Sequence, residues 1–145
     1  MARTWGMTPR QSILAECRLR GPDAVVAGCV AILDRAEVDA DLVRALAGPA
    51  AEGVLAGREG GPNGYWPRVW AVRGLLHVYD AGATPSIVTA TEDDAWRVRE
   101  MAAKVVARHR VADAFDAMVV LRDDRVARVR RAAERALVEL TADEA

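Results

Sequence analysis

The chain has 145 residues, which is long enough to bury a hydrophobic core without disulfide or metal staples. Its 20 Lys and Arg residues nearly balance its 21 Asp and Glu residues, so no overall charge draws it to nucleic acid or to a membrane. Cys17 and Cys29 have no CxxC partner or nearby histidine and are predicted to be buried free thiols. No signal-peptide pattern and no long apolar run is present. We therefore expect a soluble, cytoplasmic protein with no membrane partner.

Helix start and stop signals organise the first half of the chain. Residues 1–7 are predicted to form a flexible tail, and Thr8, Pro9 and Gln11 then have the pattern of a capping box that starts a helix. Gly21 is expected to end that helix and Pro22 to begin the next. A third helix is predicted from Leu42 to Ala47, capped by Asp39 or Asp41, with a break at Gly48-Pro49 and a continuation from Ala50 to Ala56.

A glycine-rich stretch, residues 57–64, separates this half from the next. It lacks the GK[ST] ending of a phosphate-binding loop and is interpreted as a connector. Helices are predicted after it from Pro67 to near Gly82, over 84–90, 95–109 and 111–121, and from the Asp123-Asp124 turn to about Leu140. No segment alternates as a strand does. The sequence predicts an all-α fold of about four antiparallel helix pairs in one domain, 1–145.

A short motif recurs in the second half. It consists of a valine followed by an arginine, at Val72-Arg73, Val98-Arg99 and Val129-Arg130. The last two copies follow acidic turns and precede small apolar residues. The Val-Arg pairs lie 26 (98−72) and 31 (129−98) residues apart. A helical unit that recurs at intervals of this length predicts a solenoid.

The order of an aspartate, a Val-Arg pair and small residues resembles the HEAT repeat, well over residues 84–141 and loosely over 39–81. The resemblance implies an α-solenoid in a right-handed superhelical stack, and a protein or peptide partner. Small residues allow two helices to approach closely, and arginines one step from the core stripe can reach an aspartate of a neighbouring repeat. We expect such a ladder, or contact with a ligand, from Arg73, Asp94, Arg99, Asp124 and Arg130.

Tryptophans away from the core stripe define a candidate surface. A helical wheel at about 100° per residue places Trp66, Trp70, Arg73 and His77 on one side of their helix. Trp96 takes that side of the next repeat's second helix, with Arg97 near it, and the resemblance implies that such helices line a concave face. These rings could fill gaps between repeats, or they could bind a protein or peptide, because Trp and Arg are typical hot-spot residues. The partner-binding hypothesis names Trp66, Trp70, His77, Trp96 and Arg97.

A nucleic-acid groove is the alternative. Residues 96–135 hold 11 basic and 6 acidic residues, and Arg128, Arg131 and Arg135 form a row that could contact phosphates. HEAT-like alkylpurine DNA glycosylases, which bind duplex DNA on a basic concave face, are similar in architecture, but no catalytic residue can be matched here. His77 and His109 have no ligands at metal spacing, so no metal and no cofactor is predicted. The first hypothesis is a non-enzymatic scaffold, the second is a DNA-binding domain and the third is an enzyme. Apolar ends left exposed by the terminal repeats could also form a homodimer.

Overall fold

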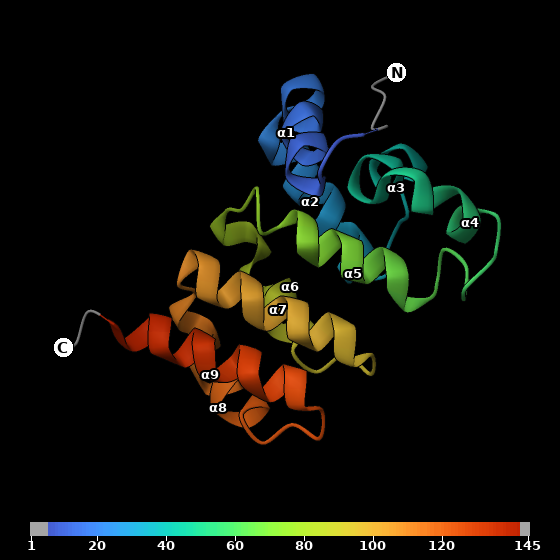
Figure 1. The fold of residues 1–145 in the computed structure, drawn as a ribbon. Helices are drawn as coiled ribbons and strands as arrows, with labels where there is room; N and C mark the ends of the chain where they lie inside the picture. Colours follow the sequence, from blue (N-terminus) through green and yellow to red (C-terminus); the bar gives the residue numbers. More distant parts are fainter. Residues whose placement is uncertain (1–5, 143–145) are drawn as a thin grey trace. The chain divides into compact units, whose positions relative to one another are not determined.

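The computed structural model describes residues 6–142, and in that range it is all-helical (Figure 1). The chain divides into two compact units, one through Ala83 and one from Thr84 onward. The predicted all-α class is confirmed. Residues 1–5 of the predicted tail lie outside the described residues.

The first unit contains α1 to α5 with two short 3-10 turns. Their bounds are α1 Pro9–Arg20, α2 Pro22–Leu33, α3 Ala40–Ala47, η1 Gly48–Ala50, α4 Ala51–Leu55, α5 Tyr65–Gly74 and η2 Ala81–Ala83. α1 packs on α2 and α3, and α5 packs on α2 and α3. The fully buried side chains at its centre are Ile13, Val25, Leu42, Val43, Leu46, Val54, Val72 and Leu75.

The helix boundaries of this unit follow the local chemistry of the sequence. The predicted capping box is confirmed, since Thr8 Oγ1 accepts from the Gln11 N–H and Gln11 Oε1 accepts from the Thr8 N–H. Asp39 is the residue that caps α3, through a bond from the Leu42 N–H to its carboxylate. Residues 57–64 contain no α-helix, and Gly57, Gly60 and Gly61 all have positive φ, which explains why glycine occupies them.

Cys29 is fully buried in this unit, and burial raises the pKa of its thiol to about 12. Cys17 is half-buried, and burial likewise raises the pKa of its thiol. Both cysteines are free, as the sequence predicts. A protonated thiol is a poor nucleophile, so neither side chain is suited to nucleophilic catalysis.

The extent predicted for the α5 helix is wrong at both ends. The helix begins at Tyr65, two residues before Pro67, which fits at its first turn because its missing N–H has no partner there. It ends at Gly74, where Leu75, Leu76 and His77 donate to carbonyls three residues back and tighten the chain into successive turns. His77 therefore does not lie on the helix, and the wheel that grouped it with Trp66 and Trp70 does not apply to it.

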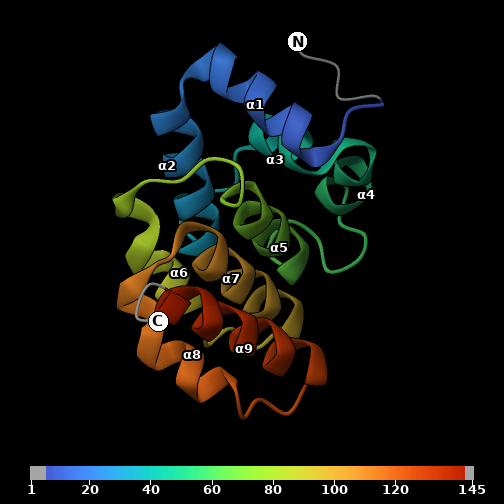
Figure 2. The same ribbon diagram turned by 60° about the vertical axis from the view of Figure 1, so that its left-hand side comes forward.

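The second unit contains two consecutive helix pairs. Their bounds are α6 Thr84–Ala90 and α7 Trp96–His109, then η3 Ala112–Ala114, α8 Phe115–Leu121 and α9 Ala127–Thr141. The helix predicted over 111–121 therefore begins as a 3-10 turn. α6 packs on α7, and α8 packs on α9. Figures 1 and 2 show α7 and α9 side by side and running in the same direction.

Small residues allow the close approach of α7 and α9. Ala102, Ala103, Ala133 and Ala136 are all fully buried, and so are Val98 and Val129 at the equivalent place in each helix. Alanine costs no side-chain entropy on burial and leaves room for a neighbouring backbone. These four alanines are therefore packing residues.

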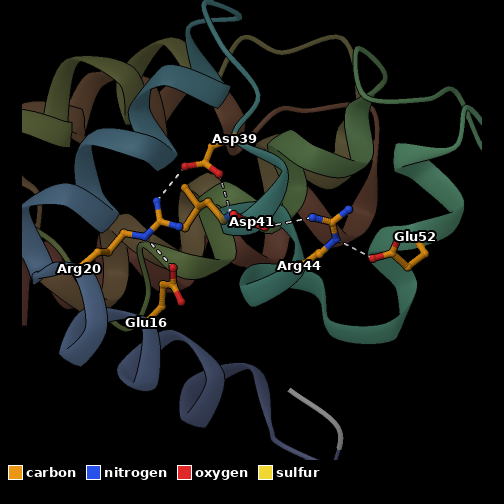
Figure 3. A network of polar contacts seen from close by, with 7 residues as sticks. Glu16, Arg20, Asp39, Asp41, Arg44 and Glu52 are labelled. Atoms are coloured by element: carbon orange, nitrogen blue, oxygen red, sulfur yellow. Dashed lines mark hydrogen bonds and ion pairs between the residues drawn. The ribbon is translucent and has the colours of Figure 1, made fainter. Parts of the chain in front are cut away.

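Ion pairs on the surface of the first unit connect α1 with the start of α3, and α3 with α4 (Figure 3). Arg20 bonds Glu16 on α1 at 2.6 Å and Asp39 at 2.8 Å, so it joins α1 to the start of α3. The Asp39 pKa is lowered, chiefly by this hydrogen bond from Arg20. Arg44 bonds Asp41 and Glu52 and so joins α3 to α4, but it is solvent-exposed and contributes little to stability.

Candidate interaction surfaces

Arg99 forms the central polar contact of the second unit. Its guanidinium donates through Nε at 2.8 Å and Nη2 at 3.2 Å to the two carboxylate oxygens of Asp124. The side chains of Arg99 and Asp124 are only 8% and 9% exposed. Arg99 Nη1 donates to the backbone carbonyls of Asp93 and Asp94, so one guanidinium joins the turn before α7 to the turn before α9. Two parallel bonds from one guanidinium give the pair with Asp124 a fixed geometry.

The turn before α7 recurs before α9. Asp93 Oδ1 accepts from the Ala95 N–H, and Asp124 Oδ1 accepts from the Val126 N–H. Arg130 Nη1 donates to the Asp124 carbonyl, as Arg99 does to Asp93. These pairs define a repeat register in which Asp93, rather than the expected Asp94, is the counterpart of Asp124. The carbonyl of Asp94 takes part in the contact, but its exposed side chain does not play the part that Asp124 plays.

Extending the repeat register backward changes the role of Arg73. Arg68 precedes Arg99 by the same interval that separates Arg99 from Arg130. It is 7% exposed and donates to the carbonyl of Gly64 at the start of its own helix. Arg73 instead donates to the Leu46 carbonyl, and burial lowers its pKa. Arg68 is thus the structural counterpart of Arg99 and Arg130.

Sequence reasoning missed Arg68 because no valine precedes it. Pro67 precedes Arg68 in the sequence, whereas Val98 precedes Arg99 and Val129 precedes Arg130. The equal spacing of the three arginines along the chain was the signal that could have found it.

The tryptophans fall into two groups, one in each unit. In α5 the Trp66 ring lies 6.0 Å from that of Trp70 and 5.1 Å from that of Tyr65. Trp66 is half-buried, whereas Trp70 is only 5% exposed and belongs to the packed interior. His77 is half-buried in the turn that follows the helix. Of the residues proposed for this group, Trp66 and His77 are half-buried and Trp70 is buried.

The second group is centred on Trp96, the first residue of α7. The Arg97 guanidinium lies 4.5 Å from the centre of the Trp96 ring, and the Arg128 guanidinium lies 5.2 Å from it. Arg97 and Arg128 are equivalent in the repeat register, since each is the second residue of its helix. We call Trp96, Arg97 and Arg128 the Trp96 cluster. Cation–π contact of this kind orients guanidinium groups that still face solvent.

Glu100 is a residue of this surface that sequence reasoning missed. Its carboxylate accepts from Arg128 Nε at 3.0 Å and lies 3.8 Å from Lys104 Nζ, although Glu100 is only 7% exposed. The spacing of Glu100 and Lys104, one turn apart on a helix, was the available signal. Glu100 fixes Arg128 over the tryptophan while 59% of the Arg128 side chain stays exposed. Arg131 and Arg135, the rest of the predicted phosphate row, are exposed on α9.

The described residues also contain a cleft in the first unit. It has a volume of about 410 Å³ and lies between the end of α2 and the start of α5, lined among others by Arg35, Glu37 and Arg68. Within residues 6–142, no group of three or more His, Cys, Asp or Glu side chains is placed to hold a metal ion. None of the helices described there has both the length and the apolar character needed to cross a membrane.

Comparison with known families agrees with this geometry. A family model described as HEAT repeats matches residues 62–138, more than half of the chain. The chain belongs to the HEAT-repeat family. No curated protein and no solved structure matches it. HEAT repeats generally serve as scaffolds for protein interactions, and the matched range covers α5 together with both helix pairs of the second unit.

Proposed function

We propose that this HEAT-repeat protein is a non-enzymatic scaffold that binds a protein or peptide partner at the Trp96 cluster. The observation that carries the proposal is the placement of two guanidinium groups, one from α7 and one from α9, on one half-buried tryptophan ring. Arg and Trp are among the residues most enriched at interaction hot spots. An apolar side chain of the partner would contact the ring, and its carboxylates would meet Arg97 and Arg128.

Preorganisation favours binding at this cluster. Arg128 is held by Glu100 and by the ring, so less side-chain entropy is lost when a partner binds. Glu100 also cancels part of the positive charge of Arg128, which disfavours a site that depends on charge alone. Trp70 is buried and has no part in this proposal. Trp66, with its half-buried ring, is the residue of the first unit that a partner could contact.

A pull-down that compares the parent protein with two variants tests the proposal. Immobilised full-length protein, Trp96→Ala and Arg131→Ala are incubated with lysate of the source cells, and the captured proteins are quantified by mass spectrometry. We expect at least one protein to be retained by the parent and by Arg131→Ala and to fall at least tenfold with Trp96→Ala. Identical captured sets for all three would contradict the proposal. Circular dichroism of each variant checks that its helices are intact.

The DNA-binding alternative rests on the exposed Arg131 and Arg135 beside Arg128. Polarisation titrations with labelled single- and double-stranded DNA and RNA, at low and moderate salt, separate it from the scaffold. Binding through phosphates weakens steeply with salt and with the loss of Arg131. Saturable, salt-sensitive binding that Arg131→Ala reduces would replace the scaffold proposal. No binding at low salt would exclude the alternative.

A further inference from the structure

The two repeats of the second unit differ in what covers their second helices. The repeat register allows α7 and α9 to be compared position by position. Arg99, Glu100, Ala103 and Val106 are buried on α7, whereas the equivalent residues of α9 are half-buried or exposed. Ala107 is half-buried, and its equivalent on α9 is 64% exposed. The α9 residues are Arg130, Arg131, Glu134, Leu137 and Val138, and we call them the α9 face.

The spacing of these residues places them on one side of the helix. Positions separated by one, three and four residues in this pattern form a single stripe on an α-helix. On α7, the same stripe includes Arg99, which bonds Asp124 in the turn before α9, and Glu100, which bonds Arg128 on α9. Among the described residues, α7 and α8 are the helices that pack closely on α9. Within residues 6–142, the α9 face therefore has the pattern of a helix-packing surface but is less covered than the equivalent stripe of α7.

The guanidinium of Arg130 indicates the chemistry of the missing neighbour. Its Nη1 bonds the Asp124 carbonyl at 2.7 Å, which reproduces the contact of Arg99 with its own turn. In Arg99 the opposite edge, Nε and Nη2, binds a carboxylate of the next repeat. Within residues 6–142, the Arg130 guanidinium bonds the Asp124 carbonyl through Nη1 and forms no ion pair through Nε or Nη2. A guanidinium already fixed by one contact is prepared to bind a carboxylate with two bonds.

Arg131 adds a second requirement. On α9 it occupies the position that Glu100 has on α7. The Glu100 carboxylate accepts a hydrogen bond from Arg128 of the neighbouring helix. Because the charge is reversed at this position, the neighbour needs a carboxylate where α9 has Arg128. Asp124 and Arg128 stand one helical turn apart in the sequence. The partner must therefore place two carboxylates at this spacing at the start of a helix, with small apolar residues following to meet Leu137 and Val138.

We propose that the α9 face docks the acidic start of a helix from a partner protein, packed as α9 packs on α7. One aspartate of that helix binds Arg130, a second carboxylate one turn later binds Arg131, and its small apolar side chains cover Leu137 and Val138. This surface is separate from the Trp96 cluster, and the proposal does not depend on binding there.

A designed probe tests the proposal directly. The probe is a labelled peptide with the sequence of residues 122–141 in which position 128 is Glu instead of Arg. A hydrocarbon staple joins positions 131 and 135, which are both exposed when α9 packs on α7. The staple is needed because the helical part of the peptide has only the 15 residues of α9, and an isolated helix of that length is marginally stable in water. Binding to the full-length protein is followed by fluorescence polarisation.

We expect saturable binding that falls at least tenfold with Arg130→Gln and with Val138→Asp. Val138 is exposed, so its replacement leaves folding intact and guards against a misfolded Arg130 variant. A probe with Asn at position 124 should also bind at least tenfold more weakly, and Trp96→Ala should leave binding unchanged. No saturable binding of the probe, or equal binding by both variants, would overturn the proposal. Self-association of the protein that Val138→Asp abolishes would also overturn it, because a second copy would then occupy the face.

Discussion

Burial and hydrogen bonding act in opposite directions on the carboxyl group of Asp124. Burial alone would raise its pKa, but the hydrogen bonds from Arg99 and from the Val126 N–H outweigh that effect, and the pKa is lowered. The carboxylate is therefore ionised in the folded protein and compensates a buried guanidinium. Removing one member of such a pair leaves the other charge buried and unpaired, which is more costly than never having formed the pair.

Asp124→Asn is predicted to lower the free energy of unfolding by about 3 kcal/mol, because Arg99 would lose its counter-charge. Urea denaturation followed by circular dichroism measures the effect. Asp123→Asn is the matched control, since Asp123 is the adjacent residue and is exposed to solvent. Equal denaturation midpoints for the two variants would show that the Arg99 pair contributes no net stability.

Sequence reasoning reached part of this arrangement. The aspartates and the Val-Arg pairs identified Arg99, Asp124 and Arg130 as a recurring group. In the structure, the two arginines lie on α7 and α9, and both bond Asp124 in the turn before α9. The Val-Arg motif misled at Arg73, because a dipeptide recurs by chance in a valine- and arginine-rich chain. Only the position of a side chain relative to its own turn distinguishes Arg68 from Arg73, and that depends on where the helix begins.

Among the helices, α5 shows how a glycine is used for close packing. A Cβ atom on Gly74 would lie 2.7 Å from Leu46 Cδ2, 3.4 Å from Cys29 Sγ and 3.5 Å from Ile13 Cδ1. All three neighbours are themselves buried. The absence of a side chain therefore lets the end of α5 approach α1, α2 and α3 together.

We predict that Gly74→Ala lowers the free energy of unfolding by about 1–3 kcal/mol, the usual cost of overpacking a core. Gly53→Ala is the matched control, because a Cβ there would meet only Arg58 at an ordinary 3.5 Å. Relief of glycine's backbone entropy should make that variant neutral or more stable by up to about 1 kcal/mol. If thermal denaturation shows both variants stabilised, the packing at Gly74 is looser than described.

Prediction from the sequence was most accurate where an element is bounded by strong local signals. Thr8 with Gln11, Gly21 with Pro22, and Asp39 all mark helix ends that the structure contains. It failed at the end of α5, where the apolar pattern continues through Leu75 and Leu76 although the helix has stopped. Those residues are apolar because they pack after the helix ends, and periodicity alone does not distinguish packing in turns from packing on a helix.

At the scale of the whole molecule, each unit has an arginine that holds aspartate in its charged form. The pKa of Asp39 is lowered, chiefly by the hydrogen bond from Arg20, and the pKa of Asp124 is lowered by hydrogen bonds that outweigh burial. A carboxyl group whose pKa is lower in the folded state contributes stability above its unfolded pKa and loses it as the pH falls through the folded pKa. We therefore expect both carboxyl groups to make the free energy of unfolding fall in acid.

Acidification below the ordinary aspartate value of 3.8 is predicted to reduce the free energy of unfolding progressively, with little change between about pH 5 and 7 from these two groups. Urea denaturation at a series of pH values measures the profile. Asp124→Asn should flatten it more than Asp39→Asn does, because Asp39 is 42% exposed and solvent screens its pair. Parallel profiles for the parent and Asp124→Asn would contradict this assignment.

The fold class and the family followed from the repeated pattern, because helix pairs with small residues at fixed places have few other ways to pack. The candidate surface followed only in part. The sequence contains Trp96, Arg97 and Arg128, but their meeting on one ring depends on the side-by-side packing of α7 and α9. The α9 face could not be predicted either, since it is recognised by comparing the burial of two repeats.

The central claim is that a protein partner binds at the Trp96 cluster, and photo-crosslinking from that position tests it most directly. Benzoylphenylalanine replaces Trp96 in the full-length protein, and Arg135, exposed on α9, is replaced in the control. After irradiation in lysate, we predict a specific protein adduct from position 96 that position 135 does not give and that excess unlabelled parent protein suppresses. The same adducts from both positions, or a nuclease-sensitive adduct from position 96, would contradict the claim.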